Sequence, residues 1–200
     1  MKDLRYDADG LIPVVVQDHL TNEVLMVAWA NEEAVGLMQS TGNTHFWSRS
    51  RQEMWRKGDT SGHFQNIVSM ETDCDRDTLL VRVEQLGQAC HTGEPTCFHE
   101  KLSGDVDGTM AILPELLRTV RGRKENPKEG SYTNRLMADE NLMCKKIIEE
   151  AGELALAIKD GDDEEMAWEL ADLIYHLIVV MVANDVPLDK AFRKLKERRG

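Results

Sequence analysis

The chain has 200 residues, of which 42% are hydrophobic and 30% charged, so it carries enough apolar sequence for one large domain or two smaller ones. Its formal net charge of −12 excludes the usual kind of nucleic-acid-binding protein, which needs a basic face. The first ten residues lack the apolar segment of a secretory signal, and the most apolar helical segment is short and interrupted by Asp172 and His176. We therefore expect a cytoplasmic protein with reduced cysteines and no nucleic-acid or membrane partner.

Residues 1–104 have the periodicity of an α+β domain. Two segments rich in Val and Leu, residues 11–18 and 23–30, flank a turn and predict a β-hairpin. A short helix is predicted to begin after Asn31, a favourable N-cap, and to end at Gly42. The remaining strand-length segments, rich in β-branched and aromatic residues, are 44–50, 63–71 and 78–86.

The periodicity becomes helical in residues 108–200, after a linker rich in Gly and Asp at residues 103–109. Residues 134–161 carry an apolar stripe at helical spacing, and residues 162–185 repeat it. Two shorter helices, each with a proline at its start, are predicted before and after this pair. We therefore expect a β-rich, metal-binding N-terminal domain (1–104) followed by an all-α helical bundle (108–200).

The segment ETDCDRDTLL places Asp73, Asp75 and Asp77 around Cys74. Like charges this close destabilise a protein unless a cation neutralises them. Carboxylate oxygens suit a hard ion such as Mg²⁺, and a thiolate suits a softer ion such as Zn²⁺. In a strand the three aspartates would point to one face and the cysteine to the other. The alternative is a polar turn before the strand that follows.

Cys74 is followed by Cys90 and Cys97, with His91 directly after the second cysteine. Three thiolates without an obvious fourth protein ligand leave one coordination position open, as in catalytic zinc sites. Water bound to zinc can have a pKa near ~7, and His91 is placed either to move a proton or to be the fourth ligand. The alternative is a structural zinc site of three cysteines and one histidine.

The segment WRKGDTSG combines glycines, a lysine and hydroxyl groups. Glycines let backbone N–H groups approach a phosphate, and the lysine and hydroxyls add donors. The alternative is a polar hairpin turn, and the tryptophan either stacks on a base or packs in the core. The candidate substrate-binding residues are Trp55, Lys57, Gly58, Thr60, Ser61 and Gly62.

The motifs WRKGDTSG, DCDRDTLL and ACHTGEPTCF, in this order and spacing, resemble the phosphoribosyl-AMP cyclohydrolases of histidine biosynthesis over essentially all of residues 1–104. The resemblance implies that the first three cysteines bind one zinc ion shared between the chains of a homodimer. It also implies that the three aspartates bind Mg²⁺ and that residues 57–62 contact the substrate. The implied reaction is hydrolytic opening of the adenine ring between N1 and C6 by zinc-activated water, with His91 moving the proton.

Four carboxylates lie on the two long predicted helices. Glu150 and Glu153 are three residues apart on the first, and Glu169 and Asp172 on the second, so the carboxylates of each pair are neighbours. Antiparallel helices joined by a short turn would bring the pairs together, and oxygen-only ligands favour Mg²⁺ or Mn²⁺. The alternative is four solvated charges on helix faces, some paired with lysines.

An E-x-x-E motif followed by E-x-x-D on the next helix resembles the all-α nucleoside triphosphate pyrophosphohydrolases. The variant EEAGE…WELADLIYHL, with SYTNRLM upstream, is similar to phosphoribosyl-ATP pyrophosphohydrolase over most of residues 109–200. This resemblance implies Mg²⁺-assisted attack of water at the α–β phosphoanhydride, with Glu153 or Glu150 as general base. Together the resemblances predict a bifunctional hydrolase of histidine biosynthesis that acts on phosphoribosyl-ATP and then phosphoribosyl-AMP. A broader nucleotide pyrophosphohydrolase and a non-catalytic, zinc-stabilised dimerisation module are the alternatives.

Overall fold

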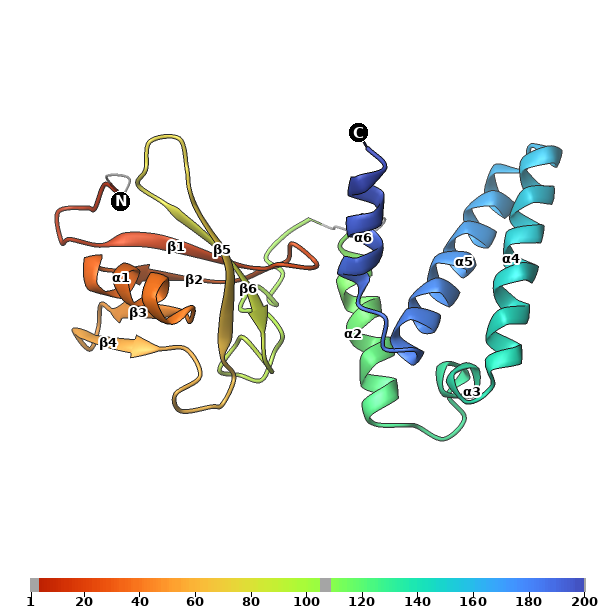
Figure 1. Ribbon diagram of the computed structural model, residues 1–200, viewed down its shortest axis with the longest axis horizontal. Coiled ribbons are helices and arrows are strands. Elements are labelled where there is room, and N and C mark those ends of the chain that lie inside the picture. The colour runs from red at the N-terminus through yellow and green to blue at the C-terminus, as the bar shows by residue number, and fades with distance from the viewer. Residues whose placement is uncertain (1–3, 105–108, 200) are drawn as a thin grey trace. The chain divides into compact units, whose positions relative to one another are not determined.

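The computed structural model describes residues 4–104 and 109–199 and divides the chain into two units, Met1–Val106 and Asp107–Gly200 (Figure 1). Among the described residues, the first unit contains six strands and one helix, and the second contains five helices. The predicted α+β fold followed by an all-α fold is therefore confirmed. Most of the predicted linker falls on residues 105–108, which lie outside the described residues.

A four-stranded sheet with the strand order β2–β1–β6–β5 forms the frame of the first unit. β1 pairs antiparallel with β2, as the predicted hairpin requires, and β5 pairs antiparallel with β6. The two hairpins are joined by a parallel pairing of β1 with β6. A separate two-stranded sheet contains β3 and β4. The strands are β1 (Ile12–Asp18), β2 (Val24–Ala30), β3 (His45–Ser48), β4 (Glu53–Arg56), β5 (Gln65–Thr72) and β6 (Leu79–Gln85).

The core of the first unit lies between α1 (Glu32–Thr41) and one face of the four-stranded sheet. As predicted, Asn31 caps this helix by accepting a hydrogen bond from the N–H of Ala34, and Gly42, with a φ of 70°, ends it. Because side chains alternate along a strand, every second residue of β1 and β6 faces the core. The buried residues contributed by these strands are Ile12, Val14, Val16, Leu79, Val81 and Val83.

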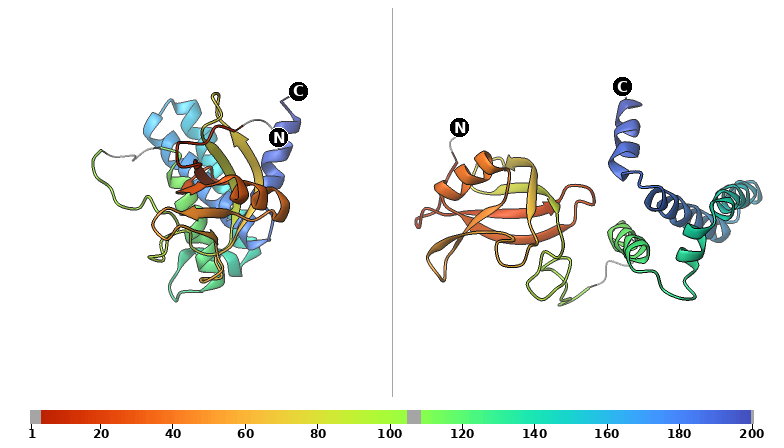
Figure 2. Two further views of the ribbon diagram at one scale, coloured as in Figure 1. Left: turned by 90° about the vertical axis from the view of Figure 1, so that its left-hand side faces the viewer. Right: turned by 60° about the horizontal axis from the view of Figure 1, so that its bottom comes forward.

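Two long helices, α4 (Glu140–Asp160) and α5 (Asp163–Ala183), lie side by side in the second unit (Figures 1 and 2). The other helices are α2 (Ile112–Glu125), α3 (Tyr132–Ala138) and α6 (Leu188–Glu197). The single helix predicted over residues 134–161 is wrong, because the chain breaks at Asp139. Asp139 has an extended backbone, and its side chain accepts a hydrogen bond from the N–H of Leu142 at 3.0 Å, so it ends α3 and caps α4.

Helix α5 is apolar and long enough, by length and composition, to cross a membrane, and it is the one such helix in the described part of the chain. Such a helix is weak evidence for a membrane span, because packed helices of water-soluble folds pass the same test. Here α5 packs along α4 and buries His176, Ile178 and Val179, while much of its remaining apolar surface is exposed in the single chain. We therefore interpret α5 as a helix whose apolar side chains pack against other protein surfaces.

Candidate functional sites

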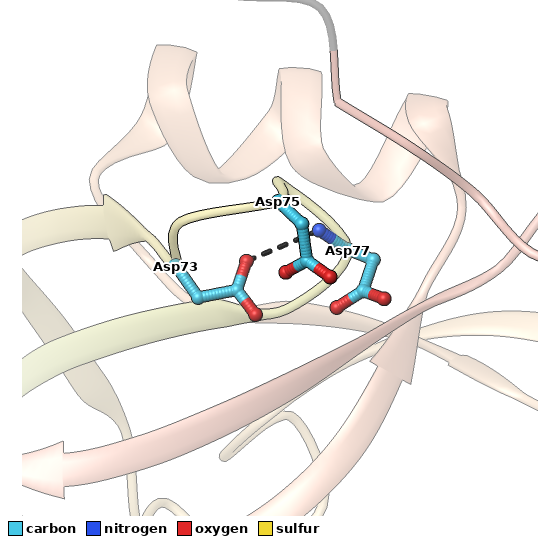
Figure 3. Close-up of side chains that lie close together, drawn as sticks. All are labelled: Asp73, Asp75 and Asp77. Atoms are coloured by element: carbon cyan, nitrogen blue, oxygen red, sulfur yellow. Dashed lines mark hydrogen bonds between the residues drawn. The ribbon is translucent and has the colours of Figure 1, made fainter.

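Three carboxylates gather in the loop between β5 and β6. One oxygen each of Asp73, Asp75 and Asp77 lies within 4.8 Å of the others, and all three residues are exposed (Figure 3). The strand alternation considered for these residues is wrong, and the alternative of a polar turn before the next strand is confirmed, because residues 73–78 form the turn between β5 and β6. Asp73 Oδ1 accepts hydrogen bonds from the backbone N–H groups of Asp77 at 3.1 Å and Thr78 at 3.2 Å, which hold this turn.

These hydrogen bonds also set the ionisation of Asp73. Burial raises the pKa of its carboxyl, but the N–H groups of Thr78 and Asp77 outweigh this effect and hold the pKa below its ordinary value. The carboxylate is therefore ionised at neutral pH beside two further acidic groups. This arrangement suits a hard divalent cation.

Cys90 and Cys97 are neighbours in the loop that follows β6. Cys90 is buried, and its Sγ accepts a hydrogen bond from the Thr92 hydroxyl at 3.1 Å. This bond and the Thr92 backbone N–H lower the pKa of Cys90 to about 6, whereas burial and the neighbouring Cys90 raise the pKa of Cys97. One thiol of the pair is therefore prepared as a thiolate, the form in which cysteine binds a soft metal ion.

Two histidines and a lysine surround this pair of cysteines. His91 Nδ1 lies 3.9 Å and His99 Nε2 lies 4.0 Å from Cys90 Sγ. Burial lowers the pKa of Lys57, and the charges of Cys97 and Cys90 oppose that shift, so the lysine and the two sulfurs interact electrostatically. The sequence analysis missed His99, for which the only signal is its position two residues after Cys97.

Cys74 does not join the other two cysteines within one chain. It precedes β6, with its Sγ 4.0 Å from Asp75 Oδ1, whereas Cys90 follows β6. The seven residues of β6 separate the two positions, which corresponds to roughly 20 Å of strand. The three cysteines are also absent from the groups of described residues whose ligand atoms all lie within 4.8 Å of one another.

The predicted substrate loop connects β4 to β5. The N–H of Gly62 donates to the carbonyl of Gly58 at 2.8 Å, and Thr60 and Ser61 between them are exposed. Trp55 is half-buried, with its ring centroid 4.9 Å from that of Phe46, so packing accounts for its position. The loop thus presents the hydroxyl groups of Thr60 and Ser61 to solvent, a few residues after Lys57.

Gly58 makes a close contact that a larger residue cannot make. It has a φ of 101°, and an added Cβ would lie 2.5 Å from Phe64 Cδ1 and 2.9 Å from its Cα. We expect Gly58→Ala to lower the free energy of unfolding by about 2–4 kcal/mol, through backbone strain and overpacking. The measurement is urea denaturation followed by tryptophan fluorescence.

The matched control for this prediction is Gly62→Ala. Gly62 also has a positive φ, of 74°, but an added Cβ would meet nothing within 4 Å. The control should lose only about 1 kcal/mol. If both variants lost the same free energy of unfolding, the close contact between Gly58 and Phe64 would contribute nothing to the effect of Gly58→Ala.

The carboxylates of α4 and α5 meet, as the sequence analysis predicts for antiparallel helices. One oxygen each of Glu150, Glu169 and Asp172 lies within 4.8 Å of the others, and Glu153 forms a second such group with Glu149 and Glu150. Glu150 is only 2% exposed, so these acidic groups are not all solvated surface charges. Four of the five are the carboxylates predicted to bind a metal ion.

Glu169 lacks a counter-charge at this cluster. Its Oε2 is buried and has no hydrogen-bond partner among the described residues. Burial, then the hydrogen bond to Glu150 and the charge of Glu153, raise the pKa of Glu169 to about 7. Lys146 forms ion pairs with Glu149 and Glu150, and its hydrogen bond to Glu150 raises its pKa. One lysine cannot neutralise the whole cluster, and a divalent cation fits the remaining oxygens.

His176 connects this cluster to α3. It is buried, its Nδ1 lies 2.7 Å from the carbonyl oxygen of Asp172, and its Nε2 lies 3.1 Å from the hydroxyl of Tyr132. The two ring nitrogens therefore fix the orientation of the imidazole behind the carboxylates. Tyr132 lies within the SYTNRLM motif, and no local pattern in the sequence places it against His176.

The comparisons with known proteins cover both units. The phosphoribosyl-AMP cyclohydrolase family pattern matches residues 26–99, and the phosphoribosyl-ATP pyrophosphohydrolase pattern matches residues 113–199. The histidine biosynthesis bifunctional protein HisIE of Nostoc sp. is 47% identical over 100% of this chain and 93% of its own length. The proteins of the same name from Gloeobacter violaceus and Lactococcus lactis are 51% and 49% identical, over 98% and 94% of this chain and 90% and 88% of their own lengths. The chain therefore belongs to the bifunctional HisIE family of histidine biosynthesis, with a phosphoribosyl-AMP cyclohydrolase domain followed by a phosphoribosyl-ATP pyrophosphohydrolase domain.

Proposed function

We propose that the cyclohydrolase domain holds one zinc ion between two chains, with Cys90 and Cys97 from one chain and Cys74 from the other. The carrying observation is that Cys90 and Cys97 are neighbours while Cys74 lies at the opposite end of β6. The pKa of about 6 at Cys90 and the closeness of His91 support a metal-binding role for this pair. Three thiolates form a donor set that suits zinc.

The proposed site requires a homodimer, and the exposed surface of the chain supports one. Phe98, directly after a proposed zinc ligand, is 61% exposed. Burying each large apolar side chain at an interface would contribute about 1.5–3 kcal/mol. Further large apolar side chains exposed on α4 and α5 are Ile148, Leu156, Ile158, Trp168, Leu170 and Leu177.

Sedimentation of the purified protein tests the dimer. At micromolar concentration we expect a species with twice the mass of one chain. In a single chain the zinc site lacks one of its cysteines, and the apolar side chains on α4 and α5 stay exposed to water. A protein that sediments only as a monomer, with zinc present, would contradict the shared site.

In the cyclohydrolase reaction we assign two residues to the substrate. When bound, zinc supplies a Lewis acid that lowers the pKa of a water molecule towards ~7. His91 lies next to the proposed ligands, where its imidazole can move the proton that adenine N1 takes up on ring opening. Lys57, with the exposed hydroxyls of its loop, binds the phosphate of phosphoribosyl-AMP. Asp73, Asp75 and Asp77 hold Mg²⁺ and thereby add a positive charge for the same nucleotide.

In the pyrophosphohydrolase reaction, Glu150, Glu153, Glu169 and Asp172 hold Mg²⁺. The observation that carries this assignment is the buried, unpartnered Glu169 Oε2 among carboxylates within 4.8 Å of one another. When bound, magnesium neutralises charge on the polyphosphate and on the carboxylates. Glu153, which is exposed, is placed to take a proton from the attacking water, and Glu150 is the alternative base. We also propose that the enzyme is cytoplasmic, where reduced cysteines persist.

The test follows phosphoribosyl-ATP by mass spectrometry in the presence of Mg²⁺ and trace Zn²⁺. Wild-type protein should release pyrophosphate and then add one water to the remaining nucleotide. Chelating the metals should stop both steps. If ordinary nucleoside triphosphates were cleaved in preference to phosphoribosyl-ATP, the assignment of this substrate would be wrong.

A further inference from the structure

A pocket beside the loop between α2 and α3 carries two cationic side chains and no acidic one. The residues that line it are Lys128, Gly130, Ser131, Tyr132, Asn134 and Arg135. In a chain with a formal charge of −12, this pocket carries a local excess of positive charge. Neither Lys128 nor Arg135 forms an ion pair with an acidic side chain in the described ranges. Both cations are therefore available to an anionic ligand.

Asn134 holds the pocket in its shape. Its Nδ2 donates to the carbonyl of Arg123 at 2.6 Å, and its Oδ1 accepts from the N–H of Lys128 at 2.9 Å. The Asn134 N–H in turn donates to Ser131 Oγ at 3.3 Å. The guanidinium of Arg135 lies over the Tyr132 ring, with its Cζ 5.0 Å from the ring centroid. The loop and the guanidinium are therefore fixed before a ligand binds, which reduces the entropy lost on binding.

The pocket is joined to the carboxylates of α4 and α5 through Tyr132. The Tyr132 hydroxyl contacts His176 Nε2, and His176 Nδ1 contacts the carbonyl oxygen of Asp172. The carboxylate of Asp172 in turn lies in the group with Glu150 and Glu169. The contacts of Tyr132 and His176 therefore connect the cationic pocket to the acidic cluster. These are the two kinds of site that a magnesium-bound polyphosphate needs along its length.

We propose that this pocket binds a phosphate group of the nucleotide substrate, with Arg135 and Lys128 contacting its oxygens. The planar guanidinium can donate two parallel hydrogen bonds to a phosphate, and the lysine adds a point charge. Phosphoribosyl-ATP offers two such groups: the end of its triphosphate and its ribose 5′-phosphate. The proposal rests on the proposed magnesium site in one respect: that site marks where the phosphoanhydride bond of the bound substrate is cleaved.

The test compares steady-state kinetics of Arg135→Ala with those of wild-type, full-length protein. We expect the KM for phosphoribosyl-ATP to rise at least about tenfold with kcat nearly unchanged, because a charge-assisted contact made in the bound substrate is lost. Arg135→Lys should restore part of the affinity. Arg121→Ala, which removes the same charge from α2 outside the pocket, is the matched control and should keep the wild-type KM.

Competition by ATP identifies which phosphate is bound. If the inhibition constant of ATP rises together with KM in Arg135→Ala, the pocket holds the triphosphate end; if only KM rises, it holds the ribose 5′-phosphate. An unchanged KM and an unchanged inhibition constant would overturn the proposal, as would an equal loss in Arg121→Ala. The magnesium concentration for half-maximal activity should stay at its wild-type value in Arg135→Ala, so a wrong magnesium site would be recognised separately.

Discussion

Replacing Cys90 by serine is expected to abolish opening of the adenine ring while pyrophosphate release continues. Thr92 stabilises the thiolate of Cys90 through a 3.1 Å hydrogen bond, and serine cannot supply a soft anionic ligand at neutral pH. Without the proposed zinc ion, activation of water is lost, and we expect ring opening to fall by more than about 10³-fold. Mass spectrometry should show phosphoribosyl-AMP accumulating in place of the hydrated product.

Two further variants show whether a loss of ring opening is specific to the zinc site and whether the site is catalytic. Cys144→Ser makes the same substitution at an exposed cysteine of α4 and should keep both activities and the wild-type zinc content. His91→Ala should keep zinc and the dimer but lose ring opening, which a purely structural zinc site would not predict. Suppose that Cys90→Ser opens the ring at the normal rate and that elemental mass spectrometry finds no zinc in it. The reaction would then not need this site.

Replacing Glu153 by alanine is expected to stop the enzyme at phosphoribosyl-ATP. Glu153 belongs to a carboxylate group with Glu149 and Glu150, and its charge contributes to the raised pKa of Glu169. Loss of a metal ligand or general base at this position should reduce pyrophosphate release by about 10²–10⁴-fold. Phosphoribosyl-AMP supplied directly should still be opened at the wild-type rate, because that reaction belongs to the other domain.

Glu153 is the most informative carboxylate to replace, because it is exposed and its loss leaves no buried charge unpaired. Removing the buried Glu150 would instead take from Lys146 one of its partners and risk about 3–5 kcal/mol of stability. Glu164→Ala, an exposed position in the first turn of α5, is the matched control and should behave as wild type. Full activity in Glu153→Ala would remove this residue from the proposed site.

Local patterns predicted the features that depend on neighbours in sequence. The cap at Asn31 and the stop at Gly42 were both correct, because capping requires only residues within one helical turn. The break at Asp139 was missed because the apolar stripe continues across it. The one local sign of a break is Asp139 itself, a favourable N-cap residue, and the stripe outweighs it. The strand β4 was missed because its four residues include no β-branched side chain.

Features that depend on distant residues could not be predicted from periodicity. The parallel pairing of β1 with β6 joins segments more than sixty residues apart, and no local pattern encodes it. The three aspartates gather through the hydrogen bonds of a turn, although the sequence favoured a strand as well as a turn. The contact between Tyr132 and His176 likewise appears only when α3 packs on α5. The carboxylate pairs were predictable because each lies within one turn of its own helix.

The separation of Cys74 from the other two cysteines has a consequence for genetics. If each zinc site takes its ligands from two chains, a chain without Cys74 and a chain without Cys90 are both inactive in ring opening when each pairs with itself. A mixed dimer of the two would contain one site with all three cysteines, because the first chain still offers Cys90 and Cys97 and the second still offers Cys74. Two defective alleles expressed in one cell would then complement each other and restore growth without histidine, which neither allele supports alone.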